Sequence, residues 1–149
     1  MVWPPKSWKL CSMTNKPGHV IDTNTLVSAL LLKNSTPRKA FDKALETGEI
    51  LVSLEVVDEL NDVLGREKFN KYVSEEERIE FLIALLQEAV FVEISEVITE
   101  CRDPRDNKFL ELAVSGNAEC IISGDGDLLS LNPFRGITIV PPREFLEIV

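Results

Sequence analysis

Short apolar segments alternate with helical patterns along most of this 149-residue chain, and that alternation limits the possible folds more than any other feature. Parallel strands need long crossover connections, which are usually helices. The sequence therefore predicts an α/β domain whose mainly parallel central sheet of about five strands is flanked by helices on both faces, in three layers. Strands are expected at 20–21, 49–52, 90–94, 120–123 and 137–140, and helices at 25–31, 38–47, 54–64, 75–89, 106–114 and 143–149.

The chain start and the cysteines indicate the type of protein. Residues 1–18 carry three prolines and no regular period, so we expect a loosely ordered leader before one domain, 19–149. The leader lacks the apolar core of a secretory signal, and no apolar run nears the ~18 residues of a membrane span. A cytoplasmic protein without membrane association is expected. Cys11, Cys101 and Cys120 form no CxxC pair and are expected to be buried or inert thiols.

The predicted helix 75–89 is apolar over more than one stripe. It starts with a capping signal, Ser74-x-x-Glu77. Ile79, Leu82, Ile83 and Leu86 line one side, and Phe81 and Leu85 broaden it. Packing from two directions inside the domain's own core is the favoured interpretation, and a partner surface is the alternative.

The net charge sets a condition on function. With 25 acidic and 16 basic residues the formal charge is -9, which is unfavourable for a protein that binds nucleic acid by neutralising phosphates. A divalent cation held by acidic side chains would reverse the local sign of the field. Alternatively, the acidity serves solubility or faces a basic partner.

Several carboxylates lie where predicted strands and helices meet. Asp22 follows strand 20–21, Asp125 follows strand 120–123, and Asp106 precedes a helix. The carboxyl edge of an open α/β sheet is where ligands bind. Glu59 lies about one and a half turns into the helix that follows Ser53. The plainer interpretations are a helix cap for Asp22 or Asp106 and a solvated helix face for Glu59.

If these four acids converge, their repulsion determines the chemistry. Two carboxylates ~4 Å apart repel by about 4 kcal/mol at an effective dielectric near 20. The group must then take up protons or hold cations, and oxygen ligands suit Mg²⁺ or Mn²⁺. We expect Asp22, Asp106 and Asp125 to ligate the metal, with Glu59 ligating it through water or orienting the nucleophile. Metal-bound water could then attack phosphorus.

Other chemistries find little support in the sequence. His19 is the only histidine and precedes the first strand, so a Ser-His or Cys-His arrangement would have to use it. The chain has no GxxxxGK[ST] and no GxGxxG motif, and Gly124-Asp125-Gly126-Asp127 lacks the spaced ligands of an EF-hand. The basic residues nearest the acids either steer phosphates or are simply solvated: Arg102, Arg105 and Lys108.

Four segments in this order resemble the PIN-domain family, in the branch of toxins related to VapC: 20–24, 53–60, 103–113 and 121–129. The resemblance covers about 19–140. It implies a PIN-like fold and a Mg²⁺- or Mn²⁺-dependent ribonuclease that cuts single-stranded RNA, with a cognate antitoxin and frequent homodimerisation. The family's acidic positions match Asp22, Glu59, Asp106 and Asp125, its small polar positions match Asn24 and Ser123, and Asp103 and Asp127 are extra acids.

Two departures and two alternatives accompany this resemblance. The leader is longer than is usual before the first strand of such toxins, and Met13 is a possible natural start. Members of the family can also keep the fold and lose activity, so a non-catalytic module whose acidic pocket receives a basic protein partner is the main alternative. A phosphatase of the haloacid dehalogenase type would need a second Asp where this chain has Asn24.

Overall fold

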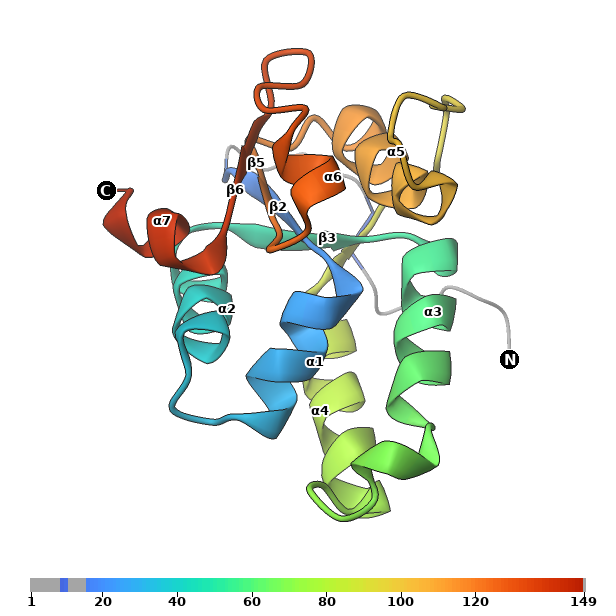
Figure 1. Ribbon diagram of the computed structural model, residues 1–149, viewed down its shortest axis with the longest axis vertical. Coiled ribbons are helices and arrows are strands. Elements are labelled where there is room, and N and C mark those ends of the chain that lie inside the picture. Colours follow the sequence, from blue (N-terminus) through green and yellow to red (C-terminus); the bar gives the residue numbers. More distant parts are fainter. Residues whose placement is uncertain (1–8, 11–15, 149) are drawn as a thin grey trace.

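A six-stranded parallel sheet forms the centre of the computed structural model, which describes residues 9–10 and 16–148 (Figure 1). The strand order is β1-β4-β3-β2-β5-β6. The predicted α/β class with a parallel sheet is confirmed. The strands are β1 (Lys9–Leu10), β2 (Gly18–Ile21), β3 (Glu49–Val52), β4 (Val90–Phe91), β5 (Cys120–Ile122) and β6 (Thr138–Val140).

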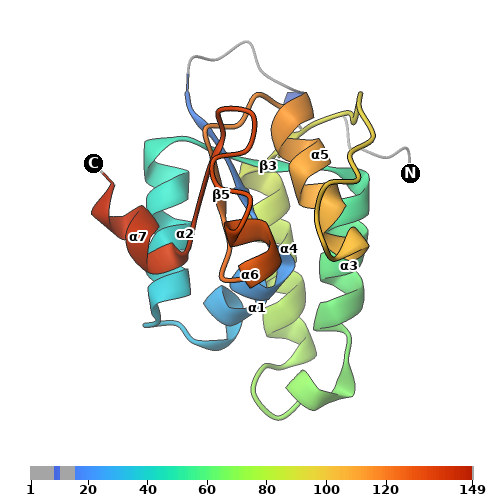
Figure 2. The same cartoon turned by 45° about the horizontal axis from the view of Figure 1, so that its top comes forward.

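Helices connect the strands and cover both faces of the sheet (Figures 1 and 2). In the described part they are α1 (Thr23–Leu31), α2 (Thr36–Thr47), α3 (Leu54–Leu64), α4 (Glu75–Glu88), α5 (Asn107–Ser115), α6 (Gly126–Leu129) and α7 (Pro142–Glu147), with 3₁₀ turns η1 (Glu67–Phe69) and η2 (Pro104–Asp106).

Alternate residues along the central strands β2, β3 and β5 face two separate cores. In β2, Val20 packs with α5 and α6, whereas Ile21 packs with α1, α2 and α4. In β5, Ile121 and Ile122 divide in the same way. This follows from the two-residue period of side chains in a strand. Both faces of the central strands are buried, as expected for a parallel sheet between two helical layers.

The helix starts match their sequence signals. Ser35, Ser53 and Ser74 each accept a hydrogen bond from a backbone N–H in the first turn of α2, α3 and α4, and Ser74 with Glu77 completes the predicted capping box. Gly48 ends α2. A Cβ at Gly48 would come within 2.2 Å of the Pro17 carbonyl oxygen, so the residue is required here by close packing.

The prediction that α4 packs from two directions is wrong. Phe81 and Leu85 are buried against the core, but Ile79 and Ile83 are 48% and 51% exposed. The broad apolar stripe of α4 is therefore only partly covered by the described residues. The predicted strand 90–94 is also shorter than expected, because it leaves the sheet after Phe91.

Two smaller outcomes concern the leader and the cysteines. Lys9–Leu10 pairs with β4 inside the segment expected to be a loose leader, while residues 1–8 and 11–15 lie outside the described residues. Cys101 and Cys120 are buried and not disulfide-bonded, and burial raises the pKa of the Cys120 thiol to about 12. Cys101 and Cys120 therefore agree with the prediction of buried or inert thiols. Cys11 lies outside the described residues. Among those residues, no helix has the length and hydrophobicity to cross a membrane.

Candidate active site

The sheet order brings the carboxyl ends of two central strands together. β2 pairs with β3 on one side and with β5 on the other. The strands β3 and β4 are therefore added toward one edge of the sheet, and β5 and β6 toward the opposite edge, starting from β2. Such a switch point leaves a crevice at the strand ends. Asp22 directly follows β2, and Ser123 directly follows β5.

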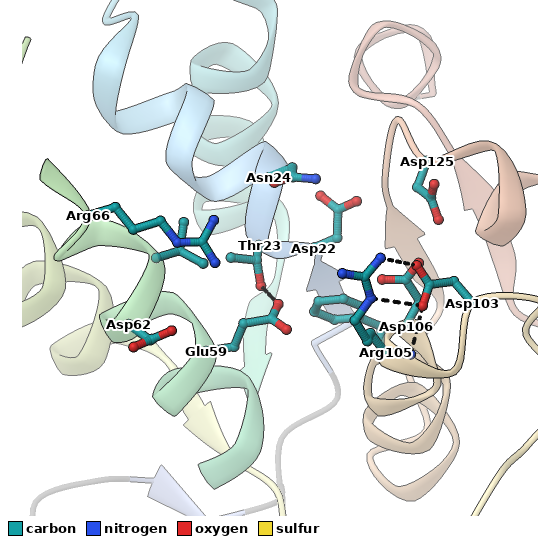
Figure 3. A pocket seen from close by; sticks show the side chains of 12 residues that line it. Asp22, Thr23, Asn24, Glu59, Asp62, Arg66, Asp103, Arg105, Asp106 and Asp125 are labelled. Carbon is teal, nitrogen blue, oxygen red and sulfur yellow. Dashed lines mark hydrogen bonds and ion pairs between the residues drawn. The ribbon is translucent and has the colours of Figure 1, made fainter. Parts of the chain in front are cut away.

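A cavity of about 420 Å³ opens at this edge, and all four predicted acids line it (Figure 3). Figure 3 shows Asp22, Asp106 and Asp125 directed toward one another, with Glu59 on the opposite side toward Thr23. The acids therefore come together although 103 positions separate the first from the last (125 − 22). The lining residues are Asp22, Thr23, Asn24, Glu59, Asp62, Val63, Arg66, Asp103, Arg105, Asp106, Phe109 and Asp125.

Asp22 is both a helix cap and a wall of the cavity. Its Oδ1 accepts a hydrogen bond from the Thr25 N–H at 2.9 Å, and its Oδ2 accepts one from the Ser123 hydroxyl. The side chain is held in place from both sides and is only 4% exposed. Burial raises the pKa of Asp22, and the charge of Asp125 acts in the same direction, although the hydrogen bonds from Ser123 and Thr25 oppose the shift.

Asp106 and Asp125 interact most strongly among the acids. Burial raises the pKa of Asp106 to about 7, and a hydrogen bond with the Asp125 carboxyl and the charges of Asp125, Asp103 and Asp22 add to the effect. The Oδ2 atom of Asp125 is buried and has no hydrogen-bond partner among the described residues. The plainer interpretation of Asp106 as a helix cap is right about its position and wrong about its side chain. It stands at the start of α5, but its side chain accepts no capping hydrogen bond and faces the cavity.

Glu59 is satisfied within the protein. Its Oε1 accepts a hydrogen bond from the Thr23 hydroxyl, and its Oε2 is paired with the Lys108 ammonium group. Lys108 also donates to the Arg105 carbonyl oxygen at 2.5 Å. These bonds connect α3 with the start of α5 across the cavity floor.

The remaining candidates occupy more exposed places. Arg105 donates two side-chain hydrogen bonds, of 2.8 and 3.1 Å, to the Asp103 carboxylate. These bonds lower the pKa of Asp103. Arg102 is 86% exposed and lies 3.8 Å from a carboxylate oxygen of Asp127. Each of the three basic residues proposed to steer phosphates is thus beside a carboxylate. Asn24 lines the cavity.

Sequence reasoning missed several lining residues. Arg66 reaches toward the cavity from the turn after α3 (Figure 3), and no hydrogen bond or ion pair of its guanidinium occurs within the described residues. Asp62 lies on α3 one turn beyond Glu59, which is the only signal that could have indicated it. His19, by contrast, is buried near the amino end of β2 against Phe145 and faces away from the acids.

The acidic side chains fit a divalent cation by their chemistry. In the described part of the chain, no three acidic, histidine or cysteine side chains are grouped closely enough to hold a metal ion as they stand. Asp125 nevertheless offers a buried oxygen without a partner among the described residues, and the raised pKa of Asp106 favours a protonated carboxyl whose proton a cation could replace. Carboxylate oxygens are the ligands that Mg²⁺ and Mn²⁺ prefer. The residues that would hold the ion are Asp22, Asp106 and Asp125.

Comparison with known proteins gives matches in sequence and in structure. The family model for the PIN domain matches residues 19–127. The uncharacterized protein MJ1680 of Methanocaldococcus jannaschii is 34% identical over 138 residues, covering 86% of this chain and 88% of the relative. Among solved structures, PAE2754 of Pyrobaculum aerophilum has a TM-score of 0.60 at 16% identity and covers 96% of this chain and 97% of that one.

Two further structures share the fold at low identity. VapBC2 of Rickettsia felis, solved with a DNA fragment from its promoter, has a TM-score of 0.57 at 15% identity and covers 82% of this chain and 96% of that one. VapC20 of Mycobacterium tuberculosis, described as a sarcin-ricin loop cleaving toxin, has a TM-score of 0.52 at 13% identity and covers 80% and 98%. Because the family model spans most of the chain and places Asp22, Glu59, Asp106 and Asp125 inside the match, this protein belongs to the PIN-domain family, whose members are generally nucleases.

Proposed function

We propose that this protein is a divalent-metal-dependent endoribonuclease that cuts single-stranded RNA. The observation that carries the proposal is the meeting of Asp22, Asp106 and Asp125 in one cavity, where none of the three forms an ion pair among the described residues. Two carboxylates ~4 Å apart repel by about 4 kcal/mol at an effective dielectric near 20, so acids that line one cavity disfavour one another's charged forms. A bound cation removes this repulsion and makes an acidic cavity accessible to a phosphodiester.

Each acid then has a defined task. Asp22 is held by Thr25 and Ser123, so it offers a fixed oxygen at the centre of the site. The raised pKa of Asp106 favours its protonated form, and a cation held there would replace that proton, while Asp125 would offer its buried oxygen. When bound, Mg²⁺ or Mn²⁺ supplies an activated water and stabilises charge on the phosphate. Glu59 does not face this group directly and serves to orient the neighbouring side chains.

The phosphates of the substrate also require cationic side chains on the protein. Arg66 and Arg105 both line the cavity, and Arg66 has no carboxylate partner among the described residues. A guanidinium group there can bind a phosphate next to the scissile one. Single-stranded RNA is favoured because its backbone can bend into a narrow crevice, whereas a rigid duplex cannot.

We further propose that the protein is the cytoplasmic toxin of a toxin-antitoxin pair. The fold shared with the VapBC2 and VapC20 structures supports this role. The cognate antitoxin would close the cavity, and a basic side chain is the group that this acidic site would accept best. The exposed apolar side chains of α4, Ile79 and Ile83, provide a surface for a homodimer.

An RNA cleavage assay tests the enzymatic proposal. Cleavage of single-stranded RNA is expected with Mn²⁺ and is expected to stop with EDTA. Asp22→Asn should lower the rate at least about a hundredfold, because the metal contributes several kcal/mol to the transition state. Asp58→Asn makes the same charge change on an exposed face of α3 and should leave the rate unchanged.

Two results would contradict the proposal. Cleavage that is indifferent to both EDTA and Asp22→Asn would show that the acids do not carry the reaction. The second result has two parts: the wild type does not cut RNA, and the metal-free Asp22→Asn variant melts at a higher temperature than the wild type. Together they would favour the non-catalytic binding module, because removing a repelling carboxylate would stabilise the fold without loss of an activity.

A further inference from the structure

The cavity contains two groups of acids that differ in how their charge is balanced. The balanced group consists of Glu59 with its two partners, Thr23 and Lys108. The unbalanced group consists of the three aspartates. Figure 3 shows Glu59 with Thr23 on one side of the cavity and the three aspartates on the other. This division bears on how many metal ions the site can hold.

In the balanced group, both oxygens of Glu59 are already in use. The Lys108 side chain is only 9% exposed and Glu59 is 30% exposed, so their ion pair is largely shielded from water. Separating a shielded pair leaves a buried charge without a partner, which is costly. Lys108 is held further by the Arg105 carbonyl oxygen at 2.5 Å. A divalent cation would have to displace this ammonium group before it could reach Glu59.

In the unbalanced group, no lysine or arginine pairs with an aspartate. Among the described residues, neither Asp22, Asp106 nor Asp125 takes part in an ion pair. Asp125 also keeps a buried oxygen without a hydrogen-bond partner. Apart from Asp62, which also lines the cavity without an ion pair among the described residues, the negative charge that no lysine or arginine pairs with lies on this side.

We propose that the Lys108 ammonium group is a built-in counter-cation for Glu59, so that the cavity binds one divalent cation, at the three aspartates, and Glu59 is not a metal ligand. The inference rests on the proposed function because it concerns the metal of that same site. Lys108 is a positioning residue in this scheme. It fixes Glu59 and, through Glu59, the Thr23 hydroxyl beside Asp22.

Titration of the metal-free protein with Mn²⁺, followed by calorimetry and by electron paramagnetic resonance, tests the inference. The wild type is expected to bind one Mn²⁺ per chain. Lys108→Met keeps most of the side-chain length but removes the charge, so it should bind two. Lys108→Arg keeps the charge and should bind one. Arg102→Met removes a positive charge from an exposed residue that pairs with Asp127 instead, and should also bind one.

A second variant keeps the test decisive if Lys108→Met does not fold, which circular dichroism would show. Glu59→Gln retains an oxygen for Lys108. It should change the Mn²⁺ affinity by less than about twofold, whereas loss of a true ligand or its support weakens binding roughly 10- to 100-fold. The double variant Lys108→Met with Glu59→Gln should return to one Mn²⁺.

Three results overturn the inference: two Mn²⁺ on the wild type, one Mn²⁺ on folded Lys108→Met, or a large loss of affinity in Glu59→Gln. Absence of Mn²⁺ binding to the wild type would overturn it as well. The proposed ribonuclease fails separately. A wild type that binds one Mn²⁺ but cuts no single-stranded RNA would disprove the enzyme and leave the charge balance of Lys108 and Glu59 intact.

Discussion

At the residue scale, the raised pKa of Asp106 makes the stability of the fold depend on pH. The pKa of Asp106 is raised to about 7 in the folded protein, mainly by burial. A carboxyl with a raised folded pKa contributes stability at low pH, and this contribution is lost as the pH rises through the folded pKa. The free energy of unfolding of the metal-free wild type should therefore decrease between about pH 4 and pH 7.

Asp106→Asn tests this dependence. The amide can keep a hydrogen bond to Asp125 but cannot ionise, so the variant should melt at a higher temperature than the wild type, with a larger difference at pH 8 than at pH 5. Saturating Mn²⁺ should reverse the order at pH 8, because only the wild type gains binding energy. Thermal melts monitored by circular dichroism measure both. Asp58→Asn serves as the control, and an equal shift in the two variants at each pH would contradict the assignment.

At the scale of elements, one lysine connects the last helix to the rest of the domain. Lys43 on α2 donates to the carbonyl oxygens of Phe145 and Leu146 at 2.9 and 3.4 Å and also bonds that of Ile148. These carbonyls lie at the end of α7, where intrahelical partners are missing and the helix dipole favours a cation. The ammonium group also lies 5.0 Å from the centre of the Phe145 ring.

Lys43→Met should lower the free energy of unfolding by about 1–3 kcal/mol, since hydrogen bonds to charged groups contribute about that amount. Lys39→Met changes an exposed lysine on the same helix and should have almost no effect. Urea denaturation of both variants gives the comparison. If Lys39→Met and Lys43→Met were equally stable, α7 would be held by its buried Phe145 alone.

At the scale of the whole molecule, a formal charge of -9 opposes the approach of RNA. Few phosphates can be neutralised by an acidic protein, so its RNA affinity should fall less steeply with salt than that of a basic nucleic-acid-binding protein. Arg66 is the guanidinium in the cavity without a carboxylate partner among the described residues, so it should account for much of this dependence.

Binding of single-stranded RNA to the inactive Asp22→Asn variant, measured by fluorescence anisotropy from 50 to 200 mM NaCl, should therefore give a shallow slope. Adding Arg66→Gln should reduce the slope of log K against log salt by about 0.7, the value for one phosphate contact on a single strand. Arg143→Gln changes an exposed arginine on α7 and is the matched control. An unchanged slope for Arg66→Gln would exclude Arg66 as a phosphate contact.

Local signals in the sequence were sufficient for most elements. The caps at Ser35, Ser53 and Ser74 and the stop at Gly48 each depend on contacts within a few residues, so their positions could be predicted. The α4 surface could not. Whether Ile79 and Ile83 are covered depends on which helices lie beside α4, and the pattern of one helix does not contain that information.

The sequence by itself determined the α/β class and the presence of acids at the ends of predicted strands, because apolar periodicity and turn chemistry are local. Only the tertiary structure decided that Asp22, Asp106 and Asp125 share one side of the cavity, while Lys108 neutralises Glu59 on the other. The sequence predicts that Lys108 either steers phosphates or is simply solvated. Its actual partner depends on how α3 and α5 pack beside the sheet, and the energy of an ion pair depends on distance and burial, which only the folded chain fixes.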